Sequence, residues 1–292
     1  MNEKVNKFLT PAIFQSPLHM GPVNAWHGHM PFGFWCIENL KPKTLVELGS
    51  HYGDSFCSMC QTIKALKLFT KSYAVDTWQG DEHAGFYDDR IYLNLKAYHD
   101  VHYGDFSRLI RSTFDEALKH FADGSIDLLH IDGLHTYEAV KHDFDSWVPK
   151  LSERGVVLFH DINVHERNFG VWKLWNELKA QYPSFEFSIS HGLGFLVVGK
   201  NPPPVALELC SLEDSDAEFL RGAFGRLGNA AILQSTVQEG RNSVRHFEAS
   251  LQEKDNRIRN LSDSLEQRDL LLKIQAAKMS ALAENSKRTI QV

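Results

Sequence analysis

The sequence predicts an α/β protein, with a Rossmann-like seven-stranded sheet whose seventh strand is antiparallel, followed by a C-terminal helical coiled coil. Between residues 44 and 200, short β-type runs alternate with amphipathic segments, which indicates helical crossovers in a largely parallel sheet. From about residue 237, apolar residues recur at alternating spacings of three and four, the pattern of a coiled coil. The two patterns predict a sheet domain followed by a separate helix.

The predicted strands are the runs TLVELG, SYAVD, HDVHYGD, SIDLLHID, GVVLFHD, FEFSIS and GFLVVGK. Only HGLG separates the last two runs. Four residues cannot hold a crossover helix, so the sixth and seventh strands must be antiparallel neighbours. The prolines of NPPPV, residues 201–205, then end the sheet domain.

We divide the chain into an N-terminal cap or substrate segment at 1–43, the sheet domain at 44–204, a helical connector at 205–236 and a coiled-coil helix at 237–292. The first segment contains aromatic and histidine side chains, which we interpret either as a cover over an acceptor or as packing onto the sheet. These are Trp26, His27, His29 and Phe32.

The coiled-coil prediction depends on an apolar seam near the C-terminus. Its apolar members are Val237, Val244, Phe247, Leu251, Ile258, Leu261, Leu265, Leu272, Met279 and Leu282, with Lys254, Arg268 and Gln275 interrupting the same seam. A lone helix would leave this stripe in water, so association through the seam is the natural solution. A long helix folded back on the sheet domain is the alternative.

Composition excludes several classes of protein. A formal charge of -6, a pI near 6.2 and the absence of a basic stripe argue against nucleic-acid binding. The N-terminus lacks a signal-peptide core and no apolar stretch is long enough to span a bilayer, which predicts a cytoplasmic protein. The four cysteines give no disulfide framework, and Cys57 and Cys60 fit helix packing better than metal or redox chemistry.

Ligands of open parallel sheets bind beyond the carboxyl ends of the strands, so the residues after each run are candidates for a site. After the first run, Gly49 and Gly53 allow a tight turn, and Glu47 suits a ligand with a cationic amino-acid group. The loop VELGSHYGDS is not the dinucleotide pattern G-x-G-x-x-G. The loop by itself is a weak signal.

Acidic residues also follow the second and third runs. Asp76, in AVDTW, is placed to accept both hydroxyls of a ribose, with Trp78 near an adenine. Asp105, in YGDFS, could accept from an exocyclic amine while Phe106 stacks on the ring. The ordered series of acids is more specific than any one of them.

These motifs, with IDLLHIDGLHTYEAVKHDF and the antiparallel hairpin, resemble a class I S-adenosylmethionine-dependent methyltransferase of the metal-dependent sugar and small-molecule O-methyltransferase type. The resemblance covers about residues 44–200 and implies that 44–204 is the methyltransferase domain. It implies a donor-binding set of Glu47, Gly49, Ser50, Gly53, Ser55, Asp76, Trp78, Asp105 and Phe106.

The fourth and fifth runs end in HID and FHD, so Asp132 and Asp161 should lie side by side if these strands are neighbours. Two close carboxylates repel unless a proton or cation lies between them, and a divalent ion such as Mg²⁺ or Mn²⁺ would resolve the repulsion. His135, three residues after Asp132, could take a proton from a substrate hydroxyl. The resemblance implies that the two acids are metal ligands and that His135 is the base.

One departure affects the metal prediction. His160 stands where such enzymes often carry an acid, and imidazole favours Mn²⁺ or a softer ion over Mg²⁺. We therefore predict Asp132, Asp161 and His160 as metal ligands, with His135 and Asp132 catalytic. The alternative is a purely structural role, in which both acids cap the following turns and both histidines form hydrogen bonds to the backbone.

The leading function is O-methyl transfer to a sugar, glycan or glycosylated metabolite, with the coiled coil joining copies of the chain or docking a partner enzyme of glycan synthesis. A metal-dependent hydrolase is the second hypothesis, but it leaves the first loop and Asp76 unexplained. The third is a coiled-coil scaffold with an inactive methyltransferase-like domain.

Overall fold

The computed structural model describes residues 3–290 of the chain. The chain separates into two compact units, Met1–Ser235 and Thr236–Val292, and each is considered by itself. No helix in the described residues is both long and apolar enough to cross a membrane.

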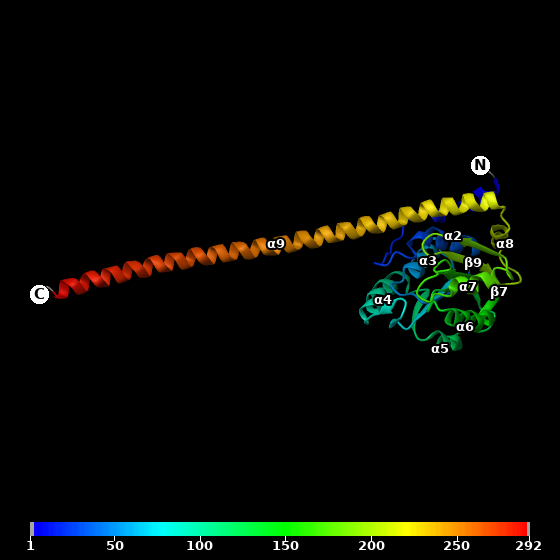
Figure 1. Cartoon of the computed structure of the whole chain (residues 1–292), viewed down its shortest axis with the longest axis horizontal. Helices are drawn as coiled ribbons and strands as arrows, with labels where there is room; N and C mark the ends of the chain where they lie inside the picture. The colour runs from blue at the N-terminus through cyan, green and yellow to red at the C-terminus, as the bar shows by residue number, and fades with distance from the viewer. Residues whose placement is uncertain (1–2, 291–292) are drawn as a thin grey trace. The chain divides into compact units, whose positions relative to one another are not determined.

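The first unit is built on a seven-stranded sheet with the order β5-β2-β1-β6-β7-β9-β8 (Figure 1). Its strands are β1 Thr44–Leu48, β2 Lys71–Asp76, β5 Ser107–Arg111, β6 Ile126–Ile131, β7 Leu151–His160, β8 Ser184–Phe187 and β9 Leu193–Val197. The first five are parallel, whereas β9 runs antiparallel to both β7 and β8. The predicted fold, including the antiparallel last strand, is confirmed.

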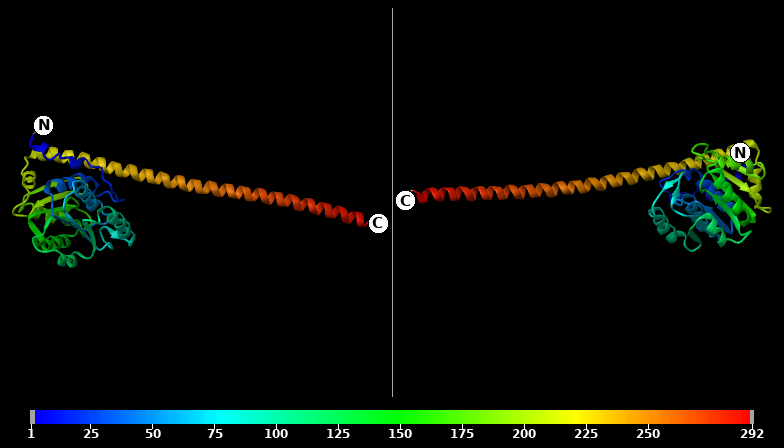
Figure 2. Two further views of the ribbon diagram at one scale, coloured as in Figure 1. Left: turned by 180° about the vertical axis from the view of Figure 1, so that it is seen from behind. Right: turned by 60° about the horizontal axis from the view of Figure 1, so that its bottom comes forward.

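Helices cover both faces of this sheet (Figure 2). One face packs against α2 Met30–Leu40, α3 Asp54–Ala65 and α4 Arg90–Tyr103, and the other against α5 Phe114–Ala117, α6 Tyr137–Trp147 and α7 Val171–Leu178. Because side chains alternate along a strand, Leu45 joins the first core and Val46 the second. Four connections are single 3₁₀ turns: Pro11–Phe14, His27–His29, Leu118–His120 and Val148–Lys150.

The predicted third strand is wrong. Residues 99–105 mostly belong to α4, and the strand begins later, at Ser107. The missed signal is a helical spacing, since Leu95, His99 and Tyr103 recur every four residues and are the buried positions of α4. The Nε2 atom of His99 lies 2.8 Å from the Ser107 hydroxyl, so the buried face of α4 contacts the first residue of β5.

The N-terminal aromatic cluster packs into the core, and Trp26 also lines the cavity at the carboxyl edge of the sheet. Trp26, His27, His29 and Phe32 are at most 4% exposed, and Phe32 stacks on Trp35 at 5.3 Å. Cys57 and Cys60 also lie in the core, on α3, where burial raises the pKa of the Cys60 thiol to about 12. Helix packing, as expected, accounts for the C-x-x-C pair.

Asp143, on the buried face of α6, provides a test of the fold. Burial raises its pKa to about 7, against an opposing effect of His142 and with a further increase from Asp115. The folded protein therefore keeps a proton that the unfolded chain releases near pH 4, so stability should fall as pH rises from about 4 to about 7.

We expect Asp143→Asn to raise the free energy of unfolding at pH 8 by about 1–3 kcal/mol and to change it little at pH 4. Urea denaturation at the two pH values measures this. Asp145→Asn, on the exposed side of the same helix, is the matched control. An equal effect of Asp143→Asn at both pH values would contradict the assignment.

The last helices are α8 Pro204–Cys210 and α9 Asp214–Ile290, and a four-residue helix, α1 Glu3–Asn6, begins the chain. Within the first unit, α9 contributes Leu220 and Phe224 to the core. From residue 236 to 282, nearly every side chain of α9 is exposed.

Candidate active site

A cavity of about 1100 Å³ lies at the carboxyl edge of the sheet. It is lined by the residues that follow β1, β2, β6 and β7, together with the short β3–β4 hairpin, Gly80–Asp81 and Gly85–Phe86. Its volume is at the upper end of the range for small-molecule sites. The cavity therefore has room for two ligands side by side.

The loop after β1 turns sharply into α3 and needs glycine at two positions. Gly49 and Gly53 have φ of 85° and 83°, and a Cβ on Gly49 would lie 2.0 Å from the carbonyl oxygen of Asp132. His51, between them, is also left-handed, with φ of 48°. Alternating conformations of this kind turn successive backbone N–H groups toward one point and form an anion-binding nest.

The anion in this nest is the protein's own Asp76. Its Oδ2 accepts hydrogen bonds from the backbone N–H groups of Ser50 and His51, at 2.8 and 3.0 Å, and its Oδ1 accepts from the N–H of Trp78 at 2.7 Å. The nest is thus filled by a carboxylate instead of a ligand phosphate. Asp76 lines the cavity and retains free lone pairs for a ligand hydroxyl.

Glu47 does not reach the cavity. It is fully buried, where it accepts a hydrogen bond from the Ser50 hydroxyl at 2.6 Å and lies 2.8 Å from Nδ1 of His130. The indole N–H of Trp26 donates to the other ring nitrogen of His130 at 3.2 Å. Glu47 therefore stabilises the loop from the protein interior, through its hydrogen bond to the Ser50 hydroxyl.

The structure brings only some of the predicted donor-binding residues together. Gly49, Ser50, Ser55 and Asp76 line the cavity, whereas Glu47, Gly53, Trp78, Asp105 and Phe106 do not. Asp105 and Phe106 precede β5, which places them at the opposite edge of the sheet, so their assignment to an adenine is corrected. Trp78 is fully buried, and its indole N–H donates to the carbonyl oxygen of His51.

The residues that take the place of Asp105 and Phe106 are Thr113 and Phe114, which follow β5 and line the cavity. The Thr113 hydroxyl accepts from the N–H of Glu116 and caps α5. The sequence carried this signal, because Thr113 and Glu116 have the spacing of a capping box. The misplaced third strand hid it.

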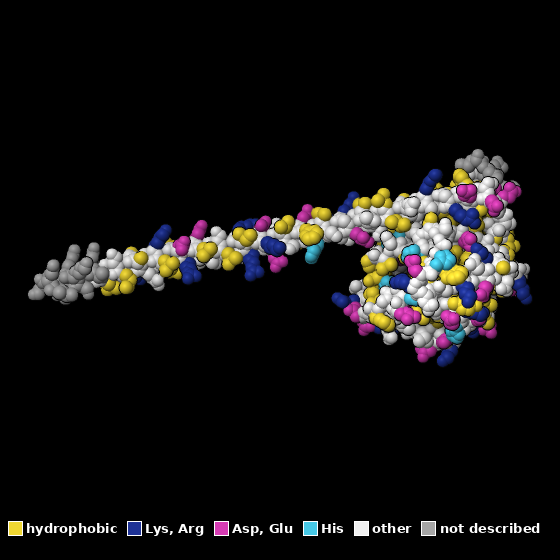
Figure 3. Space-filling view, in the orientation of Figure 1, with side chains coloured by type: hydrophobic (Ala, Val, Ile, Leu, Met, Phe, Trp, Pro, Cys, Tyr) yellow, Lys and Arg dark blue, Asp and Glu magenta, His cyan; other side chains and the backbone are white. Residues whose placement is uncertain are grey.

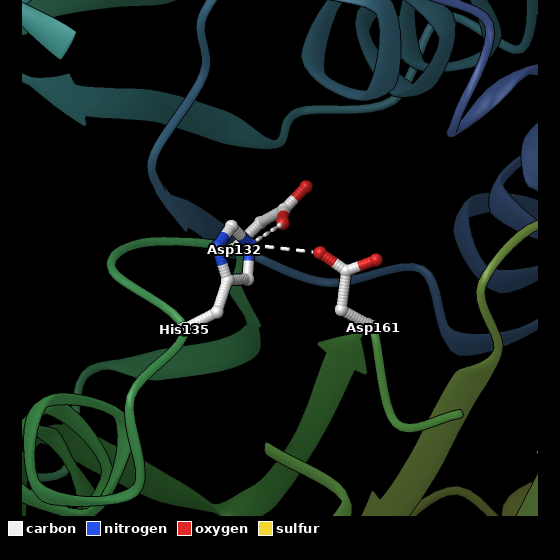
Figure 4. Close-up of side chains that lie close together, drawn as sticks. All are labelled: Asp132, His135 and Asp161. Carbon is white, nitrogen blue, oxygen red and sulfur yellow. Dashed lines mark hydrogen bonds and ion pairs between the residues drawn. The ribbon is translucent and has the colours of Figure 1, made fainter. Parts of the chain in front are cut away.

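Asp132, His135 and Asp161, which follow β6 and β7, converge in the cavity lining (Figure 4). The Nε2 atom of His135 lies 3.3 Å from Oδ1 of Asp132 and 2.8 Å from Oδ2 of Asp161. One ligand atom from each residue lies within 4.8 Å of the other two, as a metal site requires. Asp161 has φ of 61°, a strained conformation that often marks functional residues.

The charges in this cluster reinforce one another. Burial would lower the pKa of His135, but its hydrogen bonds to Asp132 and Asp161 outweigh this and raise it to about 10. Burial opposes ionisation of the two carboxyls, yet the neighbouring histidines hold both pKa values below the usual range. Without another cation, the proton on His135 separates the two carboxylates.

His160 bridges this cluster and the backbone, and its Nδ1 lies 3.5 Å from Oδ1 of Asp161. Its Nε2 lies 3.2 Å from the carbonyl oxygen of Ser190, which His29 also approaches, at 3.0 Å. Its Nδ1 lies 3.3 Å from Asp132. Asp132, His135 and Asp161 have the spacing of a metal site, and His160, the third predicted ligand, adjoins both carboxylates.

Aromatic side chains beyond the predicted set pack around His135. Phe169 stacks on the His135 ring at 4.7 Å with an interplanar angle of 11°. His83, from the β3–β4 hairpin, stacks on Phe169 at 4.4 Å, and Tyr87 stacks on His51 at 4.9 Å. The hairpin thus contacts both the loop after β1 and the aromatic ring that packs on His135.

Comparison with known proteins agrees with this architecture. Residues 46–162, less than half of the chain, match a family described as a methyltransferase domain. The matched segment contains β1, Asp76 and the Asp132, His135 and Asp161 cluster.

Two relatives of uncharacterised function share sequence with the chain. Protein y4gI of Sinorhizobium fredii is 54% identical over 184 residues, which are 63% of this chain and 20% of that protein. Protein R132 of Acanthamoeba polyphaga mimivirus is 24% identical over 164 residues, 53% of this chain and 70% of that protein. The chain thus spans about a fifth of the length of the first relative.

Similar solved structures include a candidate caffeoyl-CoA O-methyltransferase from Staphylococcus aureus, with 17% identity, a TM-score of 0.44 and coverage of 68% of this chain and 93% of that one. Another is the methyltransferase PaMTH1 of Podospora anserina bound to SAH, with 14% identity, a TM-score of 0.43 and coverage of 68% and 96%. Residues 46–162 are thus similar to a methyltransferase domain, and this segment holds the loop after β1 and the Asp132, His135 and Asp161 cluster.

Proposed function

We propose that the chain transfers a methyl group from S-adenosylmethionine to a hydroxyl of a sugar, glycan or glycosylated metabolite. The observation that carries the proposal is that one cavity is lined both by the Gly49 loop and Asp76, after β1 and β2, and by Asp132, His135 and Asp161, after β6 and β7. The first group suits the methyl donor and the second suits deprotonation of an acceptor. Methyl transfer needs both within one enclosed space.

At the donor end, Asp76 would accept hydrogen bonds from the ribose hydroxyls. The nest that a phosphate would need is already filled by its carboxylate, which fits a nucleoside ligand without phosphates. The acidic lining of the cavity, which includes Asp54 and Asp132, fits a donor with a cationic amino-acid group and a sulfonium. Phe114, after β5, offers a ring face for the adenine.

At the acceptor end, the lining mixes hydrogen-bonding side chains with aromatic rings. Asn163, Glu166, Arg167 and His191 line this part beside the ring of Phe169. A few polar groups against aromatic faces orient a ligand rich in hydroxyls. This composition supports a carbohydrate acceptor.

The residues of the cluster fit a divalent cation such as Mg²⁺ or Mn²⁺. Asp132 and Asp161 would hold it through carboxylate oxygens. Within the described residues, Oδ1 of Asp161 has only histidine nitrogens beside it, at 3.2 Å from His191 and 3.5 Å from His160. When bound, such a cation supplies Lewis-acid stabilisation of an acceptor oxygen.

His135 would then act as the base. The interactions that hold its proton are those with the two carboxylates. Once these carboxylates are neutralised, the pKa of His135 moves back toward the neutral range, where Nε2 can accept a proton from the acceptor hydroxyl. Phe169, stacked on its ring, keeps this nitrogen directed at the cluster.

The alternatives explain less of the site. A metal-dependent hydrolase would use Asp132, His135 and Asp161, but would have no need of the Gly49 loop with Asp76 in its nest. An inactive scaffold would have no need of a buried, charged cluster open to a cavity. The methyltransferase accounts for both ends.

The test is methyl transfer from radiolabelled S-adenosylmethionine, with Mg²⁺ or Mn²⁺, to a panel of nucleotide sugars and glycan oligosaccharides. We expect label in at least one acceptor and none with Asp161→Asn. Calorimetry should show donor binding by both proteins. Absence of donor binding by the wild-type protein would overturn the methyltransferase proposal, whereas phosphatase or esterase turnover would support the hydrolase.

A further inference from the structure

The second unit of the chain exposes a heptad row of apolar side chains, which Lys254, Arg268 and Gln275 interrupt. Along α9, the side chains of the seam from Val244 to Leu282 recur at spacings of three and four residues (Figure 3). The apolar members Val244, Phe247, Leu251, Ile258, Leu261, Leu265, Leu272, Met279 and Leu282 are 53–69% exposed. A stripe of this length, left in water, favours association.

The seam has a regular heptad pattern, written abcdefg. The a positions are Val237, Val244, Leu251, Ile258, Leu265, Leu272 and Met279, and the d positions are Gly240, Phe247, Lys254, Leu261, Arg268, Gln275 and Leu282. Every a position is therefore apolar. The charged residues of the seam occur only at d.

Each cation at a d position is followed immediately by an aspartate at the e position. Lys254 precedes Asp255, and Arg268 precedes Asp269. In the described part of the chain, neither Lys254 nor Arg268 makes an ion pair within its own helix. In a parallel, in-register coiled coil, a d side chain faces the same d residue of the other helix and packs beside the following e residue. Each cation would therefore meet the identical cation and an aspartate of the second copy, and the aspartate offsets the like charge at d.

We propose that the exposed seam of residues 244–282 binds a second copy of this chain, as a parallel, in-register, two-stranded coiled coil. The cross-helix pairs would join Lys254 to Asp255 and Arg268 to Asp269, each occurring twice by the two-fold symmetry. This charge complementarity holds only when both copies have the same direction and register.

Other arrangements fit the sequence less well. In an antiparallel pair, d residues face a residues of the other helix, and here Lys254 and Arg268 would face only apolar side chains. In bundles of three or more helices, the d positions are more enclosed, and the long cationic side chains could not reach water. In a two-stranded coiled coil, one side of each d residue stays exposed to water.

The first experiment is sedimentation equilibrium of the full chain. We expect a dimer, and we expect Lys254→Glu or Asp255→Lys to raise its dissociation constant about tenfold or more, because each change places like charges of neighbouring d and e residues together twice. The swap of both residues in one chain restores opposite charges and should return affinity to within about threefold of wild type. Asp263→Lys, on the outer face of the helix, is the control and should have no effect.

The second experiment tests direction and register by disulfide formation. In a Cys210→Ser background, Leu261→Cys at a d position should cross-link nearly all dimers under mild oxidation, and Asp263→Cys should cross-link few. A monomeric full chain would overturn the proposal, as would a dimer that Leu261→Cys fails to cross-link. A double charge swap as weak as the single changes would equally rule out the two ion pairs.

Discussion

Asp161→Asn is expected to lower the rate of methyl transfer by about 100- to 1000-fold, the usual loss when one preorganised electrostatic group is removed from a site. The change removes one of the two carboxylates that meet at His135. Chelation of divalent cations should have the same effect on the wild-type protein, reversed by Mg²⁺ or Mn²⁺. The measurement is transfer of label from S-adenosylmethionine to an acceptor found in the panel, with donor affinity by calorimetry as the control.

His135→Gln separates the roles of base and ligand. If His135 is the base, the change should lower the rate by at least about 100-fold while leaving the affinity for Mn²⁺ close to wild type. A large loss of Mn²⁺ affinity would make His135 a ligand instead. Full activity of the wild-type protein in chelator would remove the metal from the mechanism but leave His135 to be tested as a base.

Asp76→Ala is expected to weaken binding of S-adenosylmethionine by about 1.5–3 kcal/mol, or roughly 10- to 150-fold in Kd. The change removes the charged acceptor for the ribose hydroxyls. It also removes the acceptor for the backbone N–H groups of Ser50, His51 and Trp78, so the loop loses the group that organises it. The free energy of unfolding should therefore fall by about 2 kcal/mol or more.

Asp76→Asn distinguishes these effects from a loss of volume. An amide has one acceptor oxygen, whereas Asp76 accepts backbone bonds on both of its oxygens, so this nearly isosteric change should also weaken donor binding. Asp123→Asn, at an exposed position, is the matched control. Unchanged donor affinity in a folded Asp76→Ala protein would remove Asp76 from the site.

Several features of the fold could be predicted because they depend on local chemistry. The four residues HGLG leave no room for a crossover, which made the last two strands antiparallel, as the pairing of β8 with β9 shows. The tight turn at Gly49 and Gly53 is also local, since only glycine adopts its backbone conformation without strain. The meeting of Asp132 with Asp161 follows from parallel neighbouring strands that end at one edge.

The third strand was misplaced because two periods competed in one stretch of sequence. HDVHYGD alternates polar and apolar residues, but Leu95, His99 and Tyr103 also mark one face of a helix, and packing of that face against α3 decided the outcome. Asp105 and Phe106 were drawn to the wrong edge of the sheet by the same error. Thr113 and Phe114 follow β5 instead and line the cavity.

The sequence by itself determined which residues follow the strands, and so which chemistry gathers at the carboxyl edge of the sheet. Only the tertiary structure decided which of these side chains face the cavity. Glu47 turns inward to His130 and leaves the cavity, whereas His135 and His160 both line it beside the two carboxylates. The reason is that side-chain direction depends on the register of neighbouring strands and on the buried partners available, which lie far away in the chain.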